Sequence, residues 1–479
     1  MQMSFRQLSR AGRPLTLAAL SLAILGSLAA PQRAHASAFQ LHEDSAAAMG
    51  RAYAGSATAG DDASVVANNP AAMSDLKGTY FQADVTAINF GTSFSGSAHD
   101  ALGRPISGNG GGDAGTTMPV PAFFFATQLG DKWHVGAAFT VPFGFQTEYN
   151  NNWIGRYNAI KSKFESLDGT LSVSYDVTDN FALGVSGIAQ KTSAELTSAI
   201  NYNAVGLGLV QQGVAAGAIP PAQAAALAQQ VGTIVPPGTD GIARIKGDDW
   251  AYGWQVGALW RITPNDKFAL DYRSKISHTL EGTANFTVPS NVQALLSSPT
   301  VAALLAGAGG VPFTHTDGTA PFTTPAVATA SYWHQEERFG LGADVAWTKW
   351  DSFKDLTVYY SNPAQPTTTE AFNWRNSWYV SIGGEYYATE QLTLRAGIAL
   401  DTTPTITETR DPRVPDSTRQ LVSFGVGYKV SKNFVLNASY AHIFVNSARM
   451  NATSSTGDVI TGESDDYGNL LSLSAQYKF

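Results

Sequence analysis

The sequence contains no cysteine, which excludes disulfides, thiolate metal ligands and a lipid-anchored cysteine. Charged residues make up only 14% of the chain, and the acidic ones outnumber the basic ones to leave a net charge of −8. Such a balance argues against nucleic acid as a partner. Beyond residue 30 there is no apolar run of about 20 residues, so membrane-spanning helices are excluded there. Any membrane crossing must therefore use strands.

The beginning of the chain predicts export. Several arginines precede an apolar run from Leu15 to Ala30, and Ala34-His35-Ala36 supplies the small residues of a cleavage site. We therefore expect residues 1–36 to be a signal peptide and the mature chain to begin at Ser37. An uncleaved anchor is the alternative, but the run is short for a span of about 20 residues.

The end of the chain alternates between apolar and polar residues. Leu471, Leu473 and Ala475 alternate with serine and glutamine, and the same period of two recurs near residues 81–87 and 339–347. This periodicity predicts strands with one apolar and one polar face. A water-soluble β-sandwich would show it too, so the connections between the strands have to decide.

Short polar connections recur along the chain, and most are followed by an aromatic residue. Aromatic rings at the same height on successive hairpins are typical of the girdle at a membrane interface. The connections are Gly130-Asp131-Lys132, Thr178-Asp179-Asn180, Thr263-Pro264-Asn265-Asp266, Gln335-Glu336-Glu337-Arg338, Thr389-Glu390 and Ser431-Lys432-Asn433. The residues after them are Trp133, Phe181, Phe268, Phe339, Leu392 and Phe434.

These turns predict 14 strands between about residue 78 and Phe479, joined at the other end by long loops. An even number of strands, with short turns on one side and long loops on the other, is typical of bacterial outer-membrane barrels. Only a closed barrel satisfies the backbone of strands within lipid. The fold expected is an all-β, 14-stranded antiparallel transmembrane barrel over residues 78–479.

Two of the long loops carry almost no charge. No Asp, Glu, Lys or Arg occurs between Glu195 and Asp240, or between Glu281 and Asp317, and both intervals contain apolar stretches that predict short helices. Such helices either pack on each other as a lid or bind a hydrophobic ligand, and composition leaves both open. The apolar residues singled out are Leu207, Leu209, Val210, Leu295, Leu296, Leu304 and Leu305.

The stretch from Gly60 to Leu76 is too polar for lipid. Asn69 is a good N-cap and Pro70 suits the first position of a helix over residues 71–76. Asp61 or Asp62 can cap a turn just upstream. A barrel of 14 strands encloses more space than wall side chains fill, so we expect this stretch to plug the lumen. A periplasmic tail is the alternative.

Four motifs precede the strands: Ser37-Ala38-Phe39-Gln40-Leu41, Gly50-Arg51-Ala52-Tyr53-Ala54-Gly55, Asp61-Asp62-Ala63 and Asn69-Pro70-Ala71. Together with the 14 strands and helical loops that follow, they resemble the FadL-like long-chain fatty acid transporters of Gram-negative outer membranes. The resemblance covers essentially the whole mature chain, and its most specific part is the N-terminal combination with Asn-Pro-Ala. It implies a hatch over residues 37–77 that is gated by ligand. The implied hatch and gate residues are Ser37, Ala38, Phe39, Gln40, Leu41, Arg51, Asp61, Asp62, Asn69, Pro70 and Ala71.

The resemblance also implies a kink in the third strand, through which the ligand leaves sideways into the membrane. Here that strand holds Pro142, Phe143 and Gly144. Proline removes a donor from a strand ladder and glycine often marks a bulge. The alternative is an exposed strand end where the proline is harmless.

A carboxylate head group would require a basic partner in the lumen. Alternation turns Arg261, Arg273, Lys275 and Arg395 inward, although each of them could instead pair with an interior acid, Asp61 or Asp62 among them. The head-group contacts of the family do not align plainly with this chain.

The function expected is therefore uptake of long-chain fatty acids, with no enzyme activity and no cofactor or metal. Expected partners are outer-membrane lipid, lipopolysaccharide and the barrel-assembly machinery, the last through the strand ending at Phe479; the protein is expected to be a monomer. Uptake of other hydrophobic compounds such as aromatic hydrocarbons is an alternative. A lipid hydrolase and an open diffusion porin are others, but no His lies in a recognisable nucleophile motif.

Overall fold

The computed structural model describes the chain except residues 1–37, 60–61, 218, 298–300 and 302–309. The predicted signal peptide, Ser37, Asp61, Leu304 and Leu305 lie outside the described residues, so what the sequence predicts of them stays a prediction. Among the helices of the described part, none has the length and apolarity needed to cross a membrane, a finding that does not bear on β-barrels.

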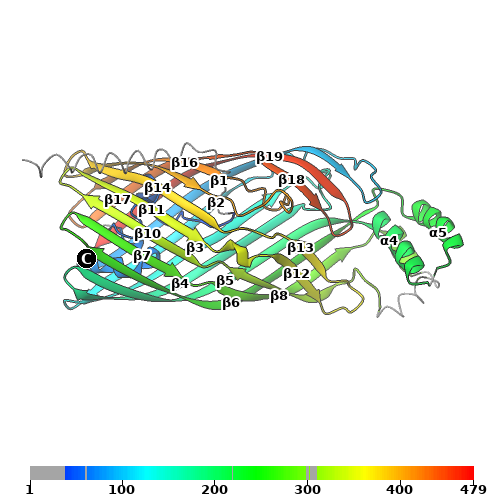
Figure 1. Cartoon of the computed structure of the whole chain (residues 1–479), viewed down its shortest axis with the longest axis horizontal. Coiled ribbons are helices and arrows are strands. Elements are labelled where there is room, and N and C mark those ends of the chain that lie inside the picture. Colours follow the sequence, from blue (N-terminus) through cyan, green and yellow to red (C-terminus); the bar gives the residue numbers. More distant parts are fainter. Residues whose placement is uncertain (1–37, 60–61, 218, 298–300, 302–309) are drawn as a thin grey trace, which may run out of the picture. The chain divides into compact units, whose positions relative to one another are not determined.

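Antiparallel strands form a single sheet that closes on itself, because β1 pairs with β2 on one side and with β19 on the other. Figure 1 shows them running side by side at a tilt. The strands are β1 (Thr79–His99), β2 (Thr116–Leu129), β3 (Trp133–Glu148), β4 (Lys161–Thr178), β5 (Phe181–Asn201), β6 (Asp240–Arg261), β7 (Asp266–Arg273), β8 (Ile276–Thr287), β9 (Thr316–Thr324), β10 (Val327–Gln335), β11 (Phe339–Thr348), β12 (Asp355–Tyr360), β13 (Thr368–Ala371), β14 (Ser377–Tyr387), β15 (Leu392–Asp401), β16 (Arg419–Lys429), β17 (Phe434–Val445), β18 (Ala448–Thr453) and β19 (Val459–Lys478).

The closed ring has 14 strands, as the sequence predicts. Some of them are interrupted part-way, so that β7 continues as β8 and β9 continues as β10. The pair β12 and β13 extends the wall beyond the ring on the side of the long loops. The short turns and the long loops lie at opposite ends (Figure 1).

Helices occur in the loops that the sequence singles out. The helices α4 (Tyr202–Ala215) and α5 (Pro221–Ile234) extend at both ends beyond residues 204–210 and 222–231, the stretches that the sequence predicts as helical. The helix α6 (Ser290–Leu296) follows β8. One turn of 3₁₀-helix, η2 (Trp350–Ser352), leads out of β11.

The wall shows the expected alternation. In β19, Leu471 and Leu473 are 54% and 52% exposed, whereas Ser472 and Ser474, which alternate with them, are buried. The apolar face is therefore outside and the polar face inside, the reverse of a water-soluble protein. Buried serine, threonine and acidic side chains line the lumen along most of the strands.

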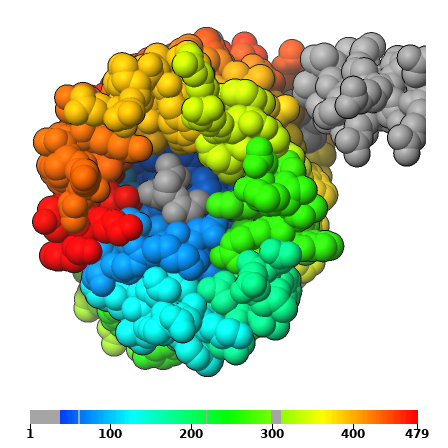
Figure 2. Space-filling view, turned by 90° about the vertical axis from the view of Figure 1, so that its left-hand side faces the viewer, coloured from blue at the N-terminus to red at the C-terminus, as the bar shows by residue number. Residues whose placement is uncertain are grey.

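The interior is filled by the N-terminal segment, residues 38–59 and 62–77, which we call the inner segment. It contains α2 (Ala46–Gly50), α3 (Val65–Asn68) and the 3₁₀-helix η1 (Pro70–Asp75). The helix α2 packs on β15, β16 and β17, while η1 packs on β3 to β6 across the ring. Seen from the short-turn end, the strands surround this blue segment (Figure 2).

Candidate functional site

The second half of the inner segment is fixed to the wall by hydrogen bonds. Asn69 caps η1, because its Oδ1 accepts from the amide of Ala71, and its Nδ2 donates to the carbonyl of Ala57. The wall opposite is Gly257, where a Cβ would lie 1.9 Å from Asn69 Oδ1. The predicted cap is thus present, although η1 is a 3₁₀-helix from Pro70 rather than an α-helix.

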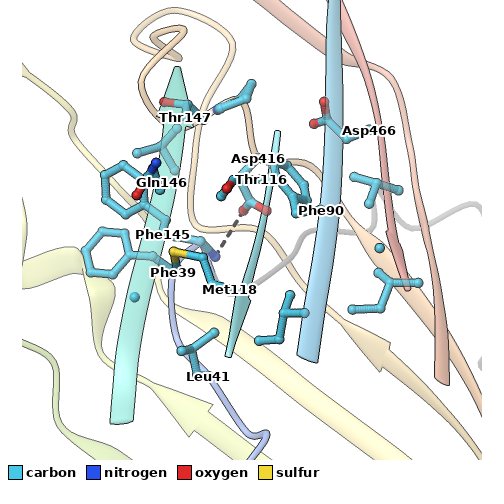
Figure 3. A pocket seen from close by; sticks show the side chains of 18 of the residues that line it. Phe39, Leu41, Phe90, Thr116, Met118, Phe145, Gln146, Thr147, Asp416 and Asp466 are labelled. Atoms are coloured by element: carbon cyan, nitrogen blue, oxygen red, sulfur yellow. Dashed lines mark hydrogen bonds between the residues drawn. The ribbon is translucent and has the colours of Figure 1, made fainter. Parts of the chain in front are cut away.

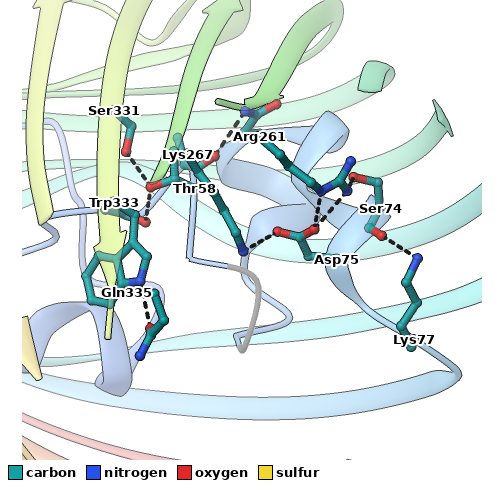
Figure 4. Close-up of polar contacts among 12 residues, drawn as sticks. Thr58, Ser74, Asp75, Lys77, Arg261, Lys267, Ser331, Trp333 and Gln335 are labelled. Atoms are coloured by element: carbon teal, nitrogen blue, oxygen red, sulfur yellow. Dashed lines mark hydrogen bonds and ion pairs between the residues drawn. The ribbon is translucent and has the colours of Figure 1, made fainter. Parts of the chain in front are cut away.

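An ion-pair cluster anchors the end of η1 at the short-turn end of the barrel. Asp75 binds Arg261 of β6 at 2.8 Å and Lys267 of β7 at 2.6 Å (Figure 4). Arg261 also binds Asp176, and its guanidinium donates to the hydroxyl of Ser74. Arg261 is therefore inside, as alternation predicts, but it serves the inner segment.

The first half of the inner segment is held by a buried ion triplet. Arg51 binds Glu385 at 2.5 Å, and Arg395 binds the same carboxylate at 2.9 Å. The backbone of Arg51 lies so close to the wall that a Cβ at Gly383 would be 2.1 Å from its carbonyl oxygen. Glycine at position 383 is thus needed for this approach.

Asp62 caps the turn upstream of Asn69, as the sequence predicts, because its carboxylate accepts from the amide of Ser64. The sequence also suggested an interior arginine as its partner, but the carboxylate accepts instead from Ser45 Oγ and Gln82 Nε2. It therefore ties the two halves of the inner segment to each other and to β1. The helix α3 begins at Val65 with no side-chain cap.

Of the four predicted basic residues, Lys275 is misplaced. A break between β7 and β8 interrupts the alternation, and Lys275 is exposed, in phase with the exposed Ser277 and Thr279. The prediction of an inward Lys275 was wrong, since counting by twos fails across an irregular residue. Arg273 does lie near the lumen, where it binds Asp168 at 2.5 Å.

The strand β3 is irregular where the sequence predicts the kink. Its ladder with β4 shifts register between Thr140 and Phe143. Among the described residues, the ladder of β3 with β2 ends at the pair Phe123 and Phe139. Beyond this point the two strands are no longer joined by backbone hydrogen bonds, although both continue.

The start of the inner segment takes the place that β2 leaves. The amide of Leu41 donates to the carbonyl of Pro142, and the amide of Gly144 donates to the carbonyl of Phe39, both at 2.9 Å. Gln40 and Phe143 form the bridge between these two bonds. The inner segment is therefore paired with β3 at the interrupted part of the wall.

Phe39 is the centre of an aromatic cluster. Its ring centroid lies 4.8 Å from that of Trp350, 4.9 Å from Phe164 and 5.4 Å from Trp374. The residues of this cluster come from the inner segment, β3, β4, β9 and the loops after β11 and β13. One ring from the inner segment thus packs among side chains from the long loops and from the kinked strand.

Beneath this cluster lies a cavity of about 110 Å³, which we call the apolar pocket (Figure 3). Phe39, Leu41 and Glu43 contribute one wall, and Met118 of β2 and Phe145 of β3 face each other across the interrupted ladder. The pocket is therefore adjacent to the part of the wall where β2 and β3 are no longer paired.

Asp416 and Arg419 clip the beginning of the inner segment at the edge of this pocket. Asp416 Oδ2 accepts from the amide of Ala38 at 3.0 Å, and Arg419 donates to the carbonyl of Ala38. The two side chains form an ion pair at 2.8 Å. Burial raises the pKa of Asp416, and the Arg419 charge opposes this rise.

Glu43 is the ionisable residue that the inner segment contributes to the lining of the pocket. Burial raises the pKa of its carboxyl to about 7, against the amide of His42, which donates to it, and the charge of Arg419. Across the described residues, no group of three or more His, Asp or Glu side chains could hold a metal ion.

The apolar loop residues divide between the two alternatives. Leu295 and Leu296 pack against a cluster with Val292 and Tyr202, so part of the loops forms a lid. Leu209 is 47% exposed on α4, and Leu207 and Val210 are half-buried. A second, smaller cavity of about 40 Å³ lies toward the long-loop ends of β5, β6, β8 and β9 and shares Leu280 and Ala320 with the cluster around Phe39.

Sequence reasoning missed several residues of the site. Trp350 and Trp374 complete the cluster around Phe39, and Glu385 is the partner of Arg51. Two features of the sequence could have indicated residues of this site. One is a dense run of charges in the loop before β16, which contains Asp416, and the other is the presence of tryptophans at the long-loop ends of strands.

The family model of Outer membrane protein transport protein (OMPP1/FadL/TodX) matches residues 27–479. The chain belongs to this family. It is therefore a β-barrel protein of the Gram-negative outer membrane that transports hydrophobic compounds, and it is not an enzyme. In this family member the long loops are extracellular and the short turns periplasmic.

Relatives and solved structures extend over almost the whole chain. The long-chain fatty acid transport protein of Escherichia coli O6:H1 is 27% identical over 431 residues, which cover 88% of this chain and 90% of that protein. The crystal structure of a Pseudomonas aeruginosa FadL homologue is similar with a TM-score of 0.82 and 28% identity, and the match covers 92% of this chain and 100% of that one. The fold is also shared by the toluene transporter TodX of Pseudomonas putida, with a TM-score of 0.62 and 19% identity. That match covers 92% of this chain and 100% of TodX.

Proposed function

We propose that this protein takes up long-chain fatty acids by ligand-gated movement of the inner segment, with lateral release into the outer membrane between β2 and β3. The observation that carries the proposal is the position of Phe39. Its ring blocks the way from the loops to the apolar pocket, while its carbonyl is bonded to β3 where the β2 ladder has ended. Displacing one short stretch would therefore open the cluster and the wall together.

The route begins at the long loops. A ligand held by the exposed apolar residues of α4 would pass the small outer cavity and reach the aromatic cluster. About fifteen methylenes at about 0.8 kcal/mol each release roughly 12 kcal/mol on burial, before the costs of association. Part of this free energy would displace Phe39, and without such a movable element the ligand would be held too long to be transported.

A disulfide between Gln40→Cys and Phe143→Cys tests the gating. The two residues are opposite each other in an antiparallel bridge, and the backbone hydrogen bonds are made by their neighbours. In such a pair the Cα atoms lie about 4.5 Å apart, which is within the range of disulfides. The chain has no other cysteine. In a strain lacking its own transporter, oleate uptake should stop when the pair is oxidised and return when it is reduced.

Single-cysteine variants control for the loss of the Phe143 ring and of the Gln40 amide. Normal oleate uptake by the oxidised double variant would rule out the proposed movement, because the inner segment would then be fixed to β3 during transport.

Aromatic hydrocarbons are the second candidate, and one observation favours them. Arg413 and Arg419, the basic residues that line the apolar pocket, are both in ion pairs, with Glu370 and Asp416 respectively. A carboxylate would have to displace an acid to bind either of them, whereas an uncharged ring would not. Growth of the complemented deletion strain on oleate compared with toluene separates the two candidates.

A further inference from the structure

A third cavity lies on the other side of the stretch that carries Phe39. It has a volume of about 130 Å³ and is enclosed by the inner segment, the kinked part of β3 and the strands β6, β7, β10, β11 and β14. We call it the polar chamber. Along residues 39–44 the side chains alternate: Phe39 and Glu43 line the apolar pocket, and Gln40, His42 and Asp44 line the polar chamber.

Leu41 lines both cavities. The stretch is thus a partition that is one residue thick, and it is the same stretch that the proposed function requires to move. When it moves, the apolar pocket and the polar chamber become one space with an apolar and a polar end.

Three buried polar groups of the chamber have no hydrogen-bond partner among the described residues. One is the ring nitrogen Nε2 of His42. Another is on Gln255, which is 2% exposed. Its Nε2 donates to the carbonyl of Ala67 at 2.8 Å and to the carboxylate of Asp271 at 3.0 Å, which fixes the amide and leaves Oε1 as the unpaired acceptor. The third is the hydroxyl of Tyr53, which is 5% exposed.

Buried polar atoms without partners are costly, about 1–3 kcal/mol each, and native proteins satisfy them with water or ligand. A cavity of this volume holds several waters, since one water occupies about 30 Å³ of liquid. The donor of Tyr53 and the acceptor of Gln255 together suit a group that both accepts and donates a hydrogen bond.

The chamber offers an anion no unpaired arginine or lysine. Asp44, Asp271 and Asp344 line it, and the one arginine among its lining residues, Arg273, is already bound to Asp168. A carboxylate would therefore enter the chamber without a cationic partner. A hydroxyl or a protonated carboxylic acid needs none.

We propose that the polar chamber is a binding site for the uncharged, hydrogen-bonding head group of an amphiphilic substrate, and that water occupies it until the inner segment moves. The proposal rests on the proposed transport function. It narrows the substrate class to molecules with a long apolar chain and one small head group that can both donate and accept a hydrogen bond.

Tyr53→Phe tests the site, because it removes one hydroxyl and keeps the ring. The probes are 1-dodecanol and dodecane, which differ by that head group, and the measurement is their initial uptake by a complemented deletion strain. We expect Tyr53→Phe to slow 1-dodecanol uptake about two- to tenfold, the range for one lost hydrogen bond, and to leave dodecane uptake unchanged. The matched control is Tyr379→Phe, whose hydroxyl donates instead to the carbonyl of Ala52.

An unchanged ratio of 1-dodecanol to dodecane uptake in Tyr53→Phe would overturn the head-group site while leaving transport intact. Wild-type protein that takes up oleate but not 1-dodecanol would overturn the head-group site alone, and wild-type protein that takes up neither oleate nor the two probes would overturn the proposed function and this site with it. A high-resolution crystal structure gives an independent measurement: we expect ordered water within hydrogen-bond distance of both Tyr53 and Gln255, and a dry chamber would contradict the proposal.

Discussion

Phe39→Ala removes the ring that the proposed function places across the route, and its effect can be worked out from the aromatic cluster. The side chain is 4% exposed and its ring lies within 6.3 Å of six other aromatic rings. Truncating a fully buried phenylalanine costs about 3–5 kcal/mol. Only the closed state has these contacts, so the equilibrium between closed and open inner segment should shift by at least about a hundredfold.

Hydrogen exchange at two amides reports this equilibrium directly. Leu41 donates to Pro142, and Gly144 donates to Phe39, and both bonds break when the stretch leaves β3. We expect both amides to exchange at least about a hundredfold faster in Phe39→Ala, because exchange of a locally opening segment follows its opening free energy. The amide of Ala72 in η1 bonds to the carbonyl of Asn69 at the anchored end and should change little.

Phe353→Ala is the matched control within the same cluster. Its ring contacts Phe322, Phe372 and Trp374 at 4.8 to 5.5 Å. The cost in overall stability should be similar, but Leu41 should keep its protection. Equal acceleration at Leu41 in both variants would refute the idea that the Phe39 ring itself holds the gate, and would leave general loosening of the cluster as the cause.

Two further predictions concern the two ends of the inner segment. Because burial raises the pKa of Glu43 to about 7 from 4.5, the closed state binds the extra proton. The closed state should therefore be more stable below pH 4.5 and lose about 3 kcal/mol of stability as the pH rises through 7. Glu43→Gln should abolish this pH dependence, which is measured by hydrogen exchange at the amide of Leu41. A pH dependence that persists in the variant would exclude Glu43 as its source. Asp75→Asn removes the carboxylate that binds Arg261 and Lys267, and should destabilise η1 by about 1–2 kcal/mol. The amide of Ala72 should then exchange faster, while exchange at the amide of Leu41 stays unchanged. Loss of protection at both amides would show that the two halves of the inner segment open as one unit.

The barrel could be read from the sequence because its determinants are local. Side chains of a strand alternate with a period of two, so the face that meets lipid is written into residues such as Leu471 and Ser472. Turns need particular residues, and the six short connections gave the number of strands. The cap at Asn69 is local too, since it joins residues two apart.

The partners of the buried charges could not be read in this way. Arg51 meets Glu385 and Arg419 meets Ala38, residues more than 300 positions apart in the chain. Nothing in either neighbourhood specifies the other. The error at Lys275 has the opposite cause, because a local rule was continued across a break that only the pairing of β6 with β7 and β8 creates.

By itself, the sequence determined an exported 14-stranded barrel with a polar segment too charged for lipid, because alternation, turn residues and capping act over a few positions. Only the tertiary structure decided where that segment lies against the wall, which ring lies at the centre of the aromatic cluster, and that two cavities of opposite polarity are separated by a single stretch. Cavities and ion pairs arise where distant strands meet around a closed ring, and their positions depend on register over the whole barrel.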